Sequence, residues 1–300
     1  MKKKTLSGSI FDIFNVLLMI VLSFSFLYPF WNTLILSFND SLDTMKGGVY
    51  FWPRIWTLDN YIAALKDDSI IGAYGITIAK TVLGTATHII LTSSFAYGLS
   101  KKNLLFRNFY LNICIVTMFF GGGMIPTYIL YKDLGLLNNF LVYIIPGFYS
   151  VGNMIIFKSF FISLPSALEE AATIDGYNHL QIFFKIVLPI SAPVIATITL
   201  FTAVGHWNSW FDAYIYMSDE GLYPLQTLLK KMLAQSQMIT DLQKSGAANM
   251  GGITSEASGT VTSNGLQLAM MMITTGPIII AYPFLQKYFV KGMTIGAVKE

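Results

Sequence analysis

Six long apolar stretches separated by shorter polar segments dominate the chain. Each reaches the roughly 20 residues that an α-helix needs to cross the hydrocarbon core of a bilayer. They cover residues 11–38, 71–99, 106–131, 138–161, 187–217 and 265–290. Glycine and proline interrupt several of them, which neighbouring helices tolerate in a membrane. The pattern predicts an all-α integral membrane protein with six transmembrane helices in a single domain, residues 1–300.

The polar segments carry their basic residues asymmetrically. If the N-terminus lies in the cytoplasm, the inner segments hold a higher density of Lys and Arg than the longer outer loops. Cytoplasmic loops of membrane proteins are enriched in these residues. We therefore expect both termini, and the polar segment 164–189, to face the cytoplasm.

The segment 164–189, LPSALEEAATIDGYNHLQIFFKIVLP, is punctuated by helix start and stop signals. Ser166 followed by Glu169 has the spacing of a capping box, which predicts a short helix from about Ala167. Gly176 tolerates the left-handed conformation that ends many helices. Asn178 with Gln181 repeats the start signal. The pattern predicts two short helices joined at a glycine hinge.

Asp175 breaks a local rule within this segment. Its negative charge falls in the last turn of the first predicted helix, where it opposes the helix dipole at a cost of about 0.3–1 kcal/mol. A residue that breaks a local preference is often kept for a contact elsewhere. We expect that contact to lie outside the helix.

The same segment resembles the EAA motif of ABC importer permeases. The match is carried by Glu170, Ala171, Ala172, Gly176, Ile186, Leu188 and Pro189 at the motif's spacing. The flanking IDG and IVLP, and the C-terminal QKYFVKGMTIGAVKE, are similar to the MalG-like carbohydrate-uptake branch. The phrase FFGGGMIPTYIL further resembles the subgroup that imports oligosaccharides derived from complex polysaccharides.

The resemblance implies an ABC type I importer permease fold in a bacterial cell membrane. It implies a second homologous permease subunit, two cytoplasmic ATPase subunits, an extracytoplasmic solute-binding protein and a carbohydrate substrate. ATP and Mg would be bound by the ATPase, so this chain would hold no cofactor. Contact with the ATPase would be made by Glu170, Ala171, Ala172, Asp175, Gly176, Leu188 and Pro189.

Candidate substrate-path residues cluster in the spans and near their outer ends. Aromatic rings and hydrogen-bonding groups are the combination that sugars need, although an interfacial aromatic belt has the same composition. Lys80 is the one formally charged residue at the centre of an apolar stretch, and it either bonds to a neighbouring helix or faces the path. The candidates are Lys80, Tyr128, Trp207, Asn208, Trp210 and Asp212.

Two further features shape the expected spans and loops. Gly121–Gly123 and then Pro126 are expected to kink or unwind the third stretch. Residues 218–264 form an outer insertion, with a helical first part that we expect to contact the solute-binding protein and a Gly-, Ser- and Thr-rich second part.

Several classes of function lack support in the sequence. The charged fraction of 12% and net charge of +3 do not indicate a soluble or nucleic-acid-binding protein. Cys114 is the single cysteine and the three histidines are scattered, so neither a disulfide framework nor a metal site is expected. No phosphate-binding loop or catalytic motif occurs. The first apolar stretch exceeds the about 7–15 residues of a signal-peptide core, so we expect it to remain uncleaved.

The sequence therefore predicts a permease subunit without catalytic residues of its own. It would import oligosaccharides by alternating access, driven by a separate ATPase. A permease for peptides, polyamines or phosphate is the nearest alternative, and an ion-coupled secondary transporter is the next. An ion-coupled transporter would need acidic residues near the centre of its spans, and none is found there.

Overall fold

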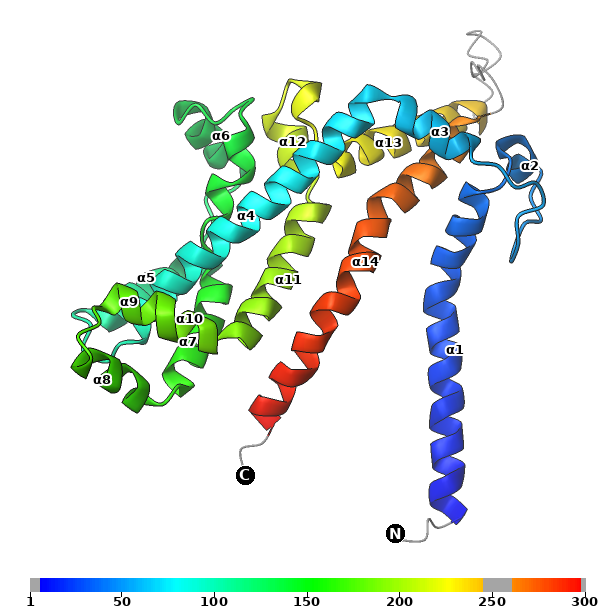
Figure 1. The fold of residues 1–300 in the computed structure, drawn as a ribbon. Coiled ribbons are helices and arrows are strands. Elements are labelled where there is room, and N and C mark those ends of the chain that lie inside the picture. Colours follow the sequence, from blue (N-terminus) through cyan, green and yellow to red (C-terminus); the bar gives the residue numbers. More distant parts are fainter. Residues whose placement is uncertain (1–5, 245–260, 298–300) are drawn as a thin grey trace. The chain divides into compact units, whose positions relative to one another are not determined.

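The computed structural model describes residues 6–244 and 261–297, and these form helices joined by loops (Figure 1). The helices are α1 (Leu6–Ser37), α2 (Ser41–Met45), α3 (Asp59–Lys66), α4 (Asp68–Ser100), α5 (Arg107–Phe119), α6 (Met124–Asp133), η1 (Phe140–Tyr143), η2 (Ile145–Gly147), α7 (Val151–Ser163), α8 (Ser166–Ile174), α9 (His179–Ile182), the π-helix η3 (Phe183–Val187), α10 (Leu188–Ile190), α11 (Ala192–Asn208), α12 (Phe211–Tyr216), η4 (Glu220–Leu222), α13 (Leu225–Lys244) and α14 (Ser263–Ala297).

Three described helices are long and apolar enough to cross a membrane. They are α1 from Ile10, α4 over its whole length, and α14 from Ser263 to Ala281. The other three predicted spans are bent pairs: α5 with α6 at 114°, η1 and η2 with α7 at 45°, and α9 and α10 with α11 at 82°. Six spans result if each bent pair crosses as one unit.

The third and fifth predicted stretches are not continuous helices. Helix α5 ends at Phe119 and α6 begins at Met124, so the glycine run separates two helices as its lack of side-chain packing predicts. In the fifth stretch, α11 ends at Asn208 and α12 begins at Phe211. The expectation of one helix across residues 187–217 is corrected, because Ser191 and Ser209 interrupt it.

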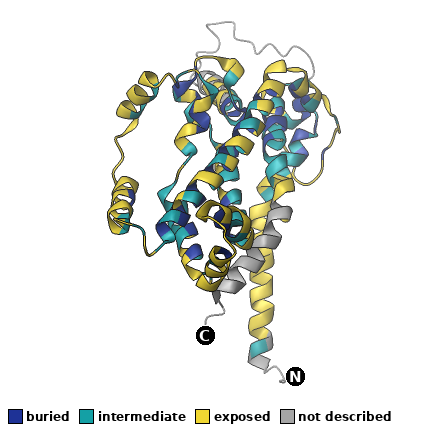
Figure 2. Ribbon diagram, turned by 60° about the vertical axis from the view of Figure 1, so that its left-hand side comes forward, coloured by how far each residue is buried: buried dark blue, intermediate teal, exposed yellow. Residues whose placement is uncertain are grey.

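The contacts divide the chain into two compact units, which are described in turn. One consists of Met1–Asp68 and Lys231–Gly276, and the other of Ser69–Lys230 and Pro277–Glu300. In the first unit, α1 is exposed at every described position from Ile10 to Leu27 (Figure 2). A helix that is apolar on all sides and unburied needs lipid or another protein around it.

A polar network orders the loop that follows α1 in the same unit. Buried Asn39 accepts hydrogen bonds from the backbone N–H groups of Arg54 and Ile55, at 2.8 and 3.0 Å, and donates to Asp43. Arg54 also forms a 2.9 Å ion pair with Asp43. The hydrogen bond from Asn39, with help from Arg54, holds the pKa of the Asp43 carboxyl below its usual value. The loop is therefore folded by its own side chains.

The second unit has two apolar clusters that α4 connects. The first joins Ala96, Tyr97 and Leu99 of α4 to buried side chains of α7, α9, η3 and α11. The second joins η1 and the segment around α12, and Ile76 of α4 packs against it. Ile89 of α4 already packs against the first cluster. Since an α-helix rises 1.5 Å per residue, the 13 residues from Ile76 to Ile89 separate the two clusters by about 20 Å along α4. Helix α4 thus links them rigidly.

Candidate functional site

The predicted two-helix segment is present, and its first helix begins without the expected cap. Helix α8 has Pro165 at its N-cap position, and no side chain bonds to the free backbone groups there. The capping box predicted for Ser166 and Glu169 is therefore wrong. The reason is that the carboxylate of Glu169 is engaged elsewhere.

Glu169 instead connects α8 to the C-terminal end of α4. Its carboxylate forms an ion pair with Lys101, and the two side chains are each 29% exposed. The hydroxyl of Tyr97 lies 3.5 Å from the same carboxylate, and the Lys101 ammonium lies 3.9 Å from the centre of the Tyr97 ring. Tyr97 packs in turn on Phe183, with ring centres 5.1 Å apart. We refer to Tyr97, Lys101 and Glu169 as the α4–α8 clamp.

The end of α8 confirms the predicted glycine hinge. Gly176 adopts a φ of +83°, in the left-handed region. Its N–H donates to the carbonyl of Thr173, and the N–H of Tyr177 donates to the carbonyl of Ala172. These two bonds form a Schellman motif, which satisfies carbonyls left free at a helix end. Asp175 is the C-cap residue and is exposed.

The second helix starts where the sequence predicts. The side chain of Asn178 accepts from the N–H of Gln181, and the Gln181 side chain accepts from the N–H of Asn178, each at 2.9 Å. The chain then continues through α9, η3 and α10. Ile182, Phe183 and Val187 are buried in the first apolar cluster. The capping box and these buried side chains hold α9 firmly on the helix bundle.

The remaining face of α8 and α9 is exposed and mixes charged with apolar side chains. Of the predicted coupling residues, Ala172 is buried, Leu188 is half-buried, and Glu170, Ala171, Asp175, Gly176 and Pro189 are exposed. Ile174 and Leu180 are 86% and 70% exposed. Adjacent carboxylates and large apolar side chains suit a protein partner better than water alone.

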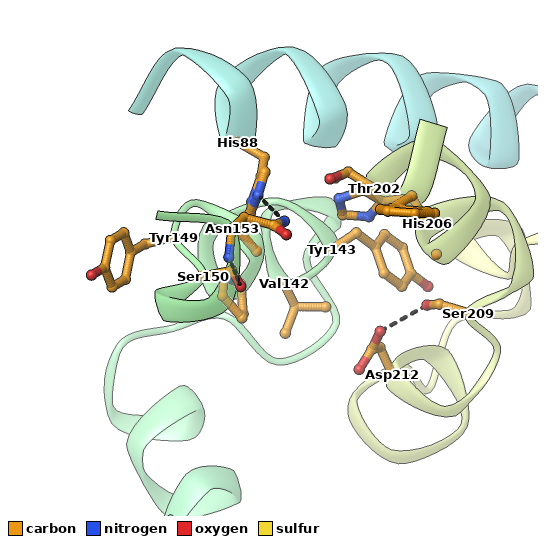
Figure 3. A pocket seen from close by; sticks show the side chains of 14 residues that line it. His88, Val142, Tyr143, Tyr149, Ser150, Asn153, Thr202, His206, Ser209 and Asp212 are labelled. Carbon is orange, nitrogen blue, oxygen red and sulfur yellow. Dashed lines mark hydrogen bonds between the residues drawn. The ribbon is translucent and has the colours of Figure 1, made fainter. Parts of the chain in front are cut away.

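A cavity of about 420 Å³ lies in the same unit, walled by α4, α7, α11, α12 and the segment containing η1 and η2 (Figure 3). The lining residues are His88, Val142, Tyr143, Pro146, Gly147, Tyr149, Ser150, Asn153, Phe201, Thr202, Gly205, His206, Ser209 and Asp212. A volume of this size is in the range of small-molecule sites. The wall combines ring faces with hydrogen-bonding groups.

His88 and Asn153 form one polar group in the cavity wall. The Nδ1 of His88 lies 2.6 Å from the carbonyl oxygen of Gly147, so Nδ1 carries the proton and donates. The amide nitrogen of Asn153 then donates to His88 Nε2, at 2.9 Å. The amide oxygen of Asn153 points away from His88 (Figure 3).

The imidazole of His206 occupies a slot between two glycines. A Cβ on Gly84 would lie 2.6 Å from both Cε1 and Nε2 of the ring, and a Cβ on Gly147 would lie 3.2 Å from Cε1. Both distances are shorter than ordinary carbon contacts of about 3.5–4.0 Å. The absence of a side chain at both positions therefore gives the ring its place in the wall.

Substituting Gly84 by alanine is expected to displace this ring and lower stability. Overpacking of this kind typically costs about 1–3 kcal/mol, which thermal unfolding of the purified protein would detect. Gly98→Ala is the matched control, because a Cβ there meets nothing within 4 Å on the same helix. Adding His206→Ala to Gly84→Ala is expected to restore the midpoint temperature of thermal unfolding. A Gly84→Ala variant as stable as the Gly98→Ala variant would disprove the slot.

Lys80 bonds to a neighbouring helix. Its fully buried ammonium donates to the backbone carbonyl of Ser209 at 2.7 Å and to the Ser209 hydroxyl oxygen at 3.2 Å. The Ser209 hydroxyl donates to Asp212 at 2.8 Å. A positive charge at the C-terminal end of α11 also complements the helix dipole. Lys80 thus fixes the break between α11 and α12 and orients Asp212.

The structure brings together only part of the predicted substrate path. Asp212 lines the cavity. Lys80 does not line it but bonds to Ser209, which does. The other four candidates are not among the lining residues. Trp207 is buried with its edge on Tyr74, and Trp210 packs on Phe211 and Tyr214. Asn208 accepts from Gln226, and Tyr128 stacks on Tyr216. For these four, a role in the path stays a prediction.

Except for Asp212, the polar side chains of the wall were not among the predicted site residues; His88, Asn153 and His206 are examples. Each is an isolated polar residue in an apolar stretch, which was the available signal. Their convergence depends on contacts between distant segments. Within the described residues no group of His, Cys, Asp and Glu could hold a metal ion.

Apolar helices of spanning length, a cavity and an exposed polar two-helix segment define a membrane transport component. The chain belongs to the family described as "Binding-protein-dependent transport system inner membrane component", which it matches over residues 5–295. It is therefore an ABC importer permease subunit of the membrane, and such subunits are not enzymes themselves.

Individual relatives cover almost the whole chain. Protein LplC of Bacillus subtilis is 38% identical over 98% of this chain and 97% of its own length. The polygalacturonan/rhamnogalacturonan transport system permease protein YtcP of the same organism is 38% identical over 90% of this chain and 92% of its own. A solved chain of a bacterial ABC transporter involved in the import of the acidic polysaccharide alginate is 33% identical, with a TM-score of 0.83 over 96% of this chain and 100% of that one.

Proposed function

We propose that this chain is a transmembrane permease subunit of an ATP-driven importer of oligosaccharides derived from complex polysaccharides. The support for carbohydrate is that YtcP and the solved alginate transporter are both named for polysaccharide-derived substrates. A cavity whose wall offers hydrogen-bonding groups and ring faces is consistent with such a substrate.

The observation that carries the coupling part of the proposal is the geometry of α8 and α9. These helices are anchored on the bundle by the clamp and by Ile182, Phe183 and Val187, while Glu170, Ala171 and Asp175 remain exposed. An ATPase docked on that exposed face would move α8, and the clamp would pass the movement to α4. Alternating access then requires two states whose balance the nucleotide shifts. ATP and Mg belong to the ATPase in this scheme.

The proposed topology has six spans and cytoplasmic termini, with each bent helix pair counted as one crossing. It is supported by the number of spanning candidates and by the distribution of Lys and Arg. The proposed assembly adds a second homologous permease, two ATPase subunits and a solute-binding protein. The outer insertion 218–264 is a candidate contact for that protein. Its first part is helical in α13, and residues 245–260 lie outside the described residues.

One alternative concerns the solute. A permease for peptides, polyamines or phosphate would share the coupling segment but move a different solute. The ion-coupled transporter that the sequence left as a further alternative is excluded by membership of the ABC permease family. Uptake of labelled solutes by the complete transporter in proteoliposomes distinguishes a saccharide from these solutes.

The proposal predicts ATP-dependent uptake of oligosaccharides that requires the binding protein on the outer side. Uptake of peptides, polyamines or phosphate with no saccharide taken up would contradict the substrate. Saccharide uptake driven by an ion gradient in the absence of ATP would contradict the mechanism.

A further inference from the structure

The two charged groups at the cavity, Lys80 and Asp212, are bridged by Ser209. The Lys80 ammonium is fully buried and bonded to two atoms of Ser209. Asp212 lies on the other side of the same serine and accepts its hydroxyl proton. Among the described residues, Ser209 is the only hydrogen-bond partner of Asp212. The negative charge on the wall and the positive charge behind it therefore compensate each other.

Among the described residues that line the cavity, no lysine or arginine is available to a ligand. The lining residues include one carboxylate, two histidines and no lysine or arginine. Both ring nitrogens of His88 are engaged, by Gly147 and by Asn153. The ring of His206 is held in its slot between Gly84 and Gly147.

The groups that do remain for a ligand suit hydroxyls. Asp212 and the amide oxygen of Asn153 can accept, and the imidazole of His206 can donate or accept. A ligand hydroxyl that loses its water is stabilised where such partners are provided and destabilised where they are missing.

A carboxylate on the ligand would be disfavoured in the same cavity. A carboxylate that gives up water against this wall would gain no paired cation in return. Asp212 lines the cavity and Lys80 does not, so Asp212 would add like-charge repulsion. We propose that this cavity receives an uncharged glycosyl unit and rejects a uronate unit. The inference rests on the proposed function as a carbohydrate permease and adds the charge class of the sugar. It differs from the acidic glycans for which YtcP and the alginate transporter are named.

A pair of probes that differ in charge, and otherwise only by the methyl groups of an ester, tests this directly. Trigalacturonate and its fully methyl-esterified form share one carbohydrate skeleton, and only the first carries carboxylates. The complete permease and ATPase complex in nanodiscs, without solute-binding protein, is titrated with each probe while saturation-transfer NMR reports binding. We expect the ester to bind at least about tenfold more tightly than the acid, since like-charge contacts cost several kcal/mol.

Two variants locate the preference at Asp212. Asp212→Asn keeps an acceptor for the Ser209 hydroxyl but leaves the Lys80 charge uncompensated, so the affinity for the acid relative to the ester is expected to rise about tenfold or more. Adding Lys80→Met, a side chain of similar length, removes that charge as well and is expected to cancel the gain. Size-exclusion chromatography of each complex verifies its assembly.

Equal or tighter binding of the acid by the unmodified complex would overturn the inference. So would binding of neither probe, or a preference that Asp212→Asn leaves unchanged. None of these results depends on ATP. The inference can therefore fail while ATP-dependent oligosaccharide uptake, the test of the proposed function, still succeeds.

Discussion

A Lys101→Glu variant is expected to assemble in the membrane but to lose at least about 90% of its uptake, because two carboxylates would then face each other in the α4–α8 clamp. Lys101 and Glu169 are only 29% exposed, so water screens them incompletely. Hydrogen bonds to charged groups contribute about 1.5–3 kcal/mol, and the reversal adds repulsion to that loss. We expect ATP hydrolysis to lose its stimulation by the loaded binding protein.

The reciprocal exchange separates coupling from simple misfolding. Lys101→Glu combined with Glu169→Lys restores an ion pair across the same gap, and partial recovery of uptake is expected. Recovery is incomplete because the exchange removes the ammonium from the face of Tyr97. Lys102→Glu is the matched control, since this exposed neighbour forms no such pair within the part of the chain that the structure describes. Equal loss in Lys101→Glu and Lys102→Glu would refute the clamp.

The second large effect is expected at Gly176. Its φ of +83° is unfavourable for side chains with a Cβ, by about 1–2 kcal/mol in the left-handed region, and valine is branched at that carbon. A Cβ there would meet nothing within 4 Å, so the effect of a substitution is conformational rather than steric. Gly176→Val is expected to distort the hinge between α8 and α9 and abolish coupled uptake.

Asparagine provides the comparison at the same position. It adopts the left-handed conformation more readily than other non-glycine residues, so Gly176→Asn is expected to keep most of the uptake. The readouts are uptake by proteoliposomes and the amount of ATPase that copurifies with the permease. If the valine variant transports as well as the asparagine variant, coupled uptake does not depend on the left-handed conformation of residue 176.

Local sequence signals predicted much of the coupling segment and the breaks in the helices. The left-handed Gly176, the Asn178 capping box and the glycine run before α6 are each determined by neighbouring residues. Ser166 and Glu169 show where this reasoning fails. The capping signal was present, but a lysine 68 positions away pairs with the carboxylate. A distant charged partner outweighed a local preference.

The cavity was less predictable for the same reason. Lys80 and Ser209 are 129 positions apart, and His88 and Asn153 are 65 apart. The spacing of apolar residues along the chain does not specify which helices contact one another. Aromatic composition drew attention to Trp207 and Trp210, which the fold uses for packing. Asp212 was proposed for the substrate path because a carboxylate near an apolar region needs a partner. It lines the cavity, and its role in the path stays a prediction.

The central claim is that α8 and α9 receive movement from an ATPase on another chain, and site-directed photocross-linking tests it most directly. In a Cys114→Ser background, a single cysteine replaces either Ala171 or Tyr214 and is labelled with a benzophenone. Ala171 is exposed on α8. Tyr214 is 69% exposed on α12, which follows the C-terminal end of α11 (Figure 1). In the complete transporter, the account predicts cross-links from position 171 to the ATPase subunit and none from position 214. Cross-links to the ATPase from position 214 but not from position 171 would contradict it.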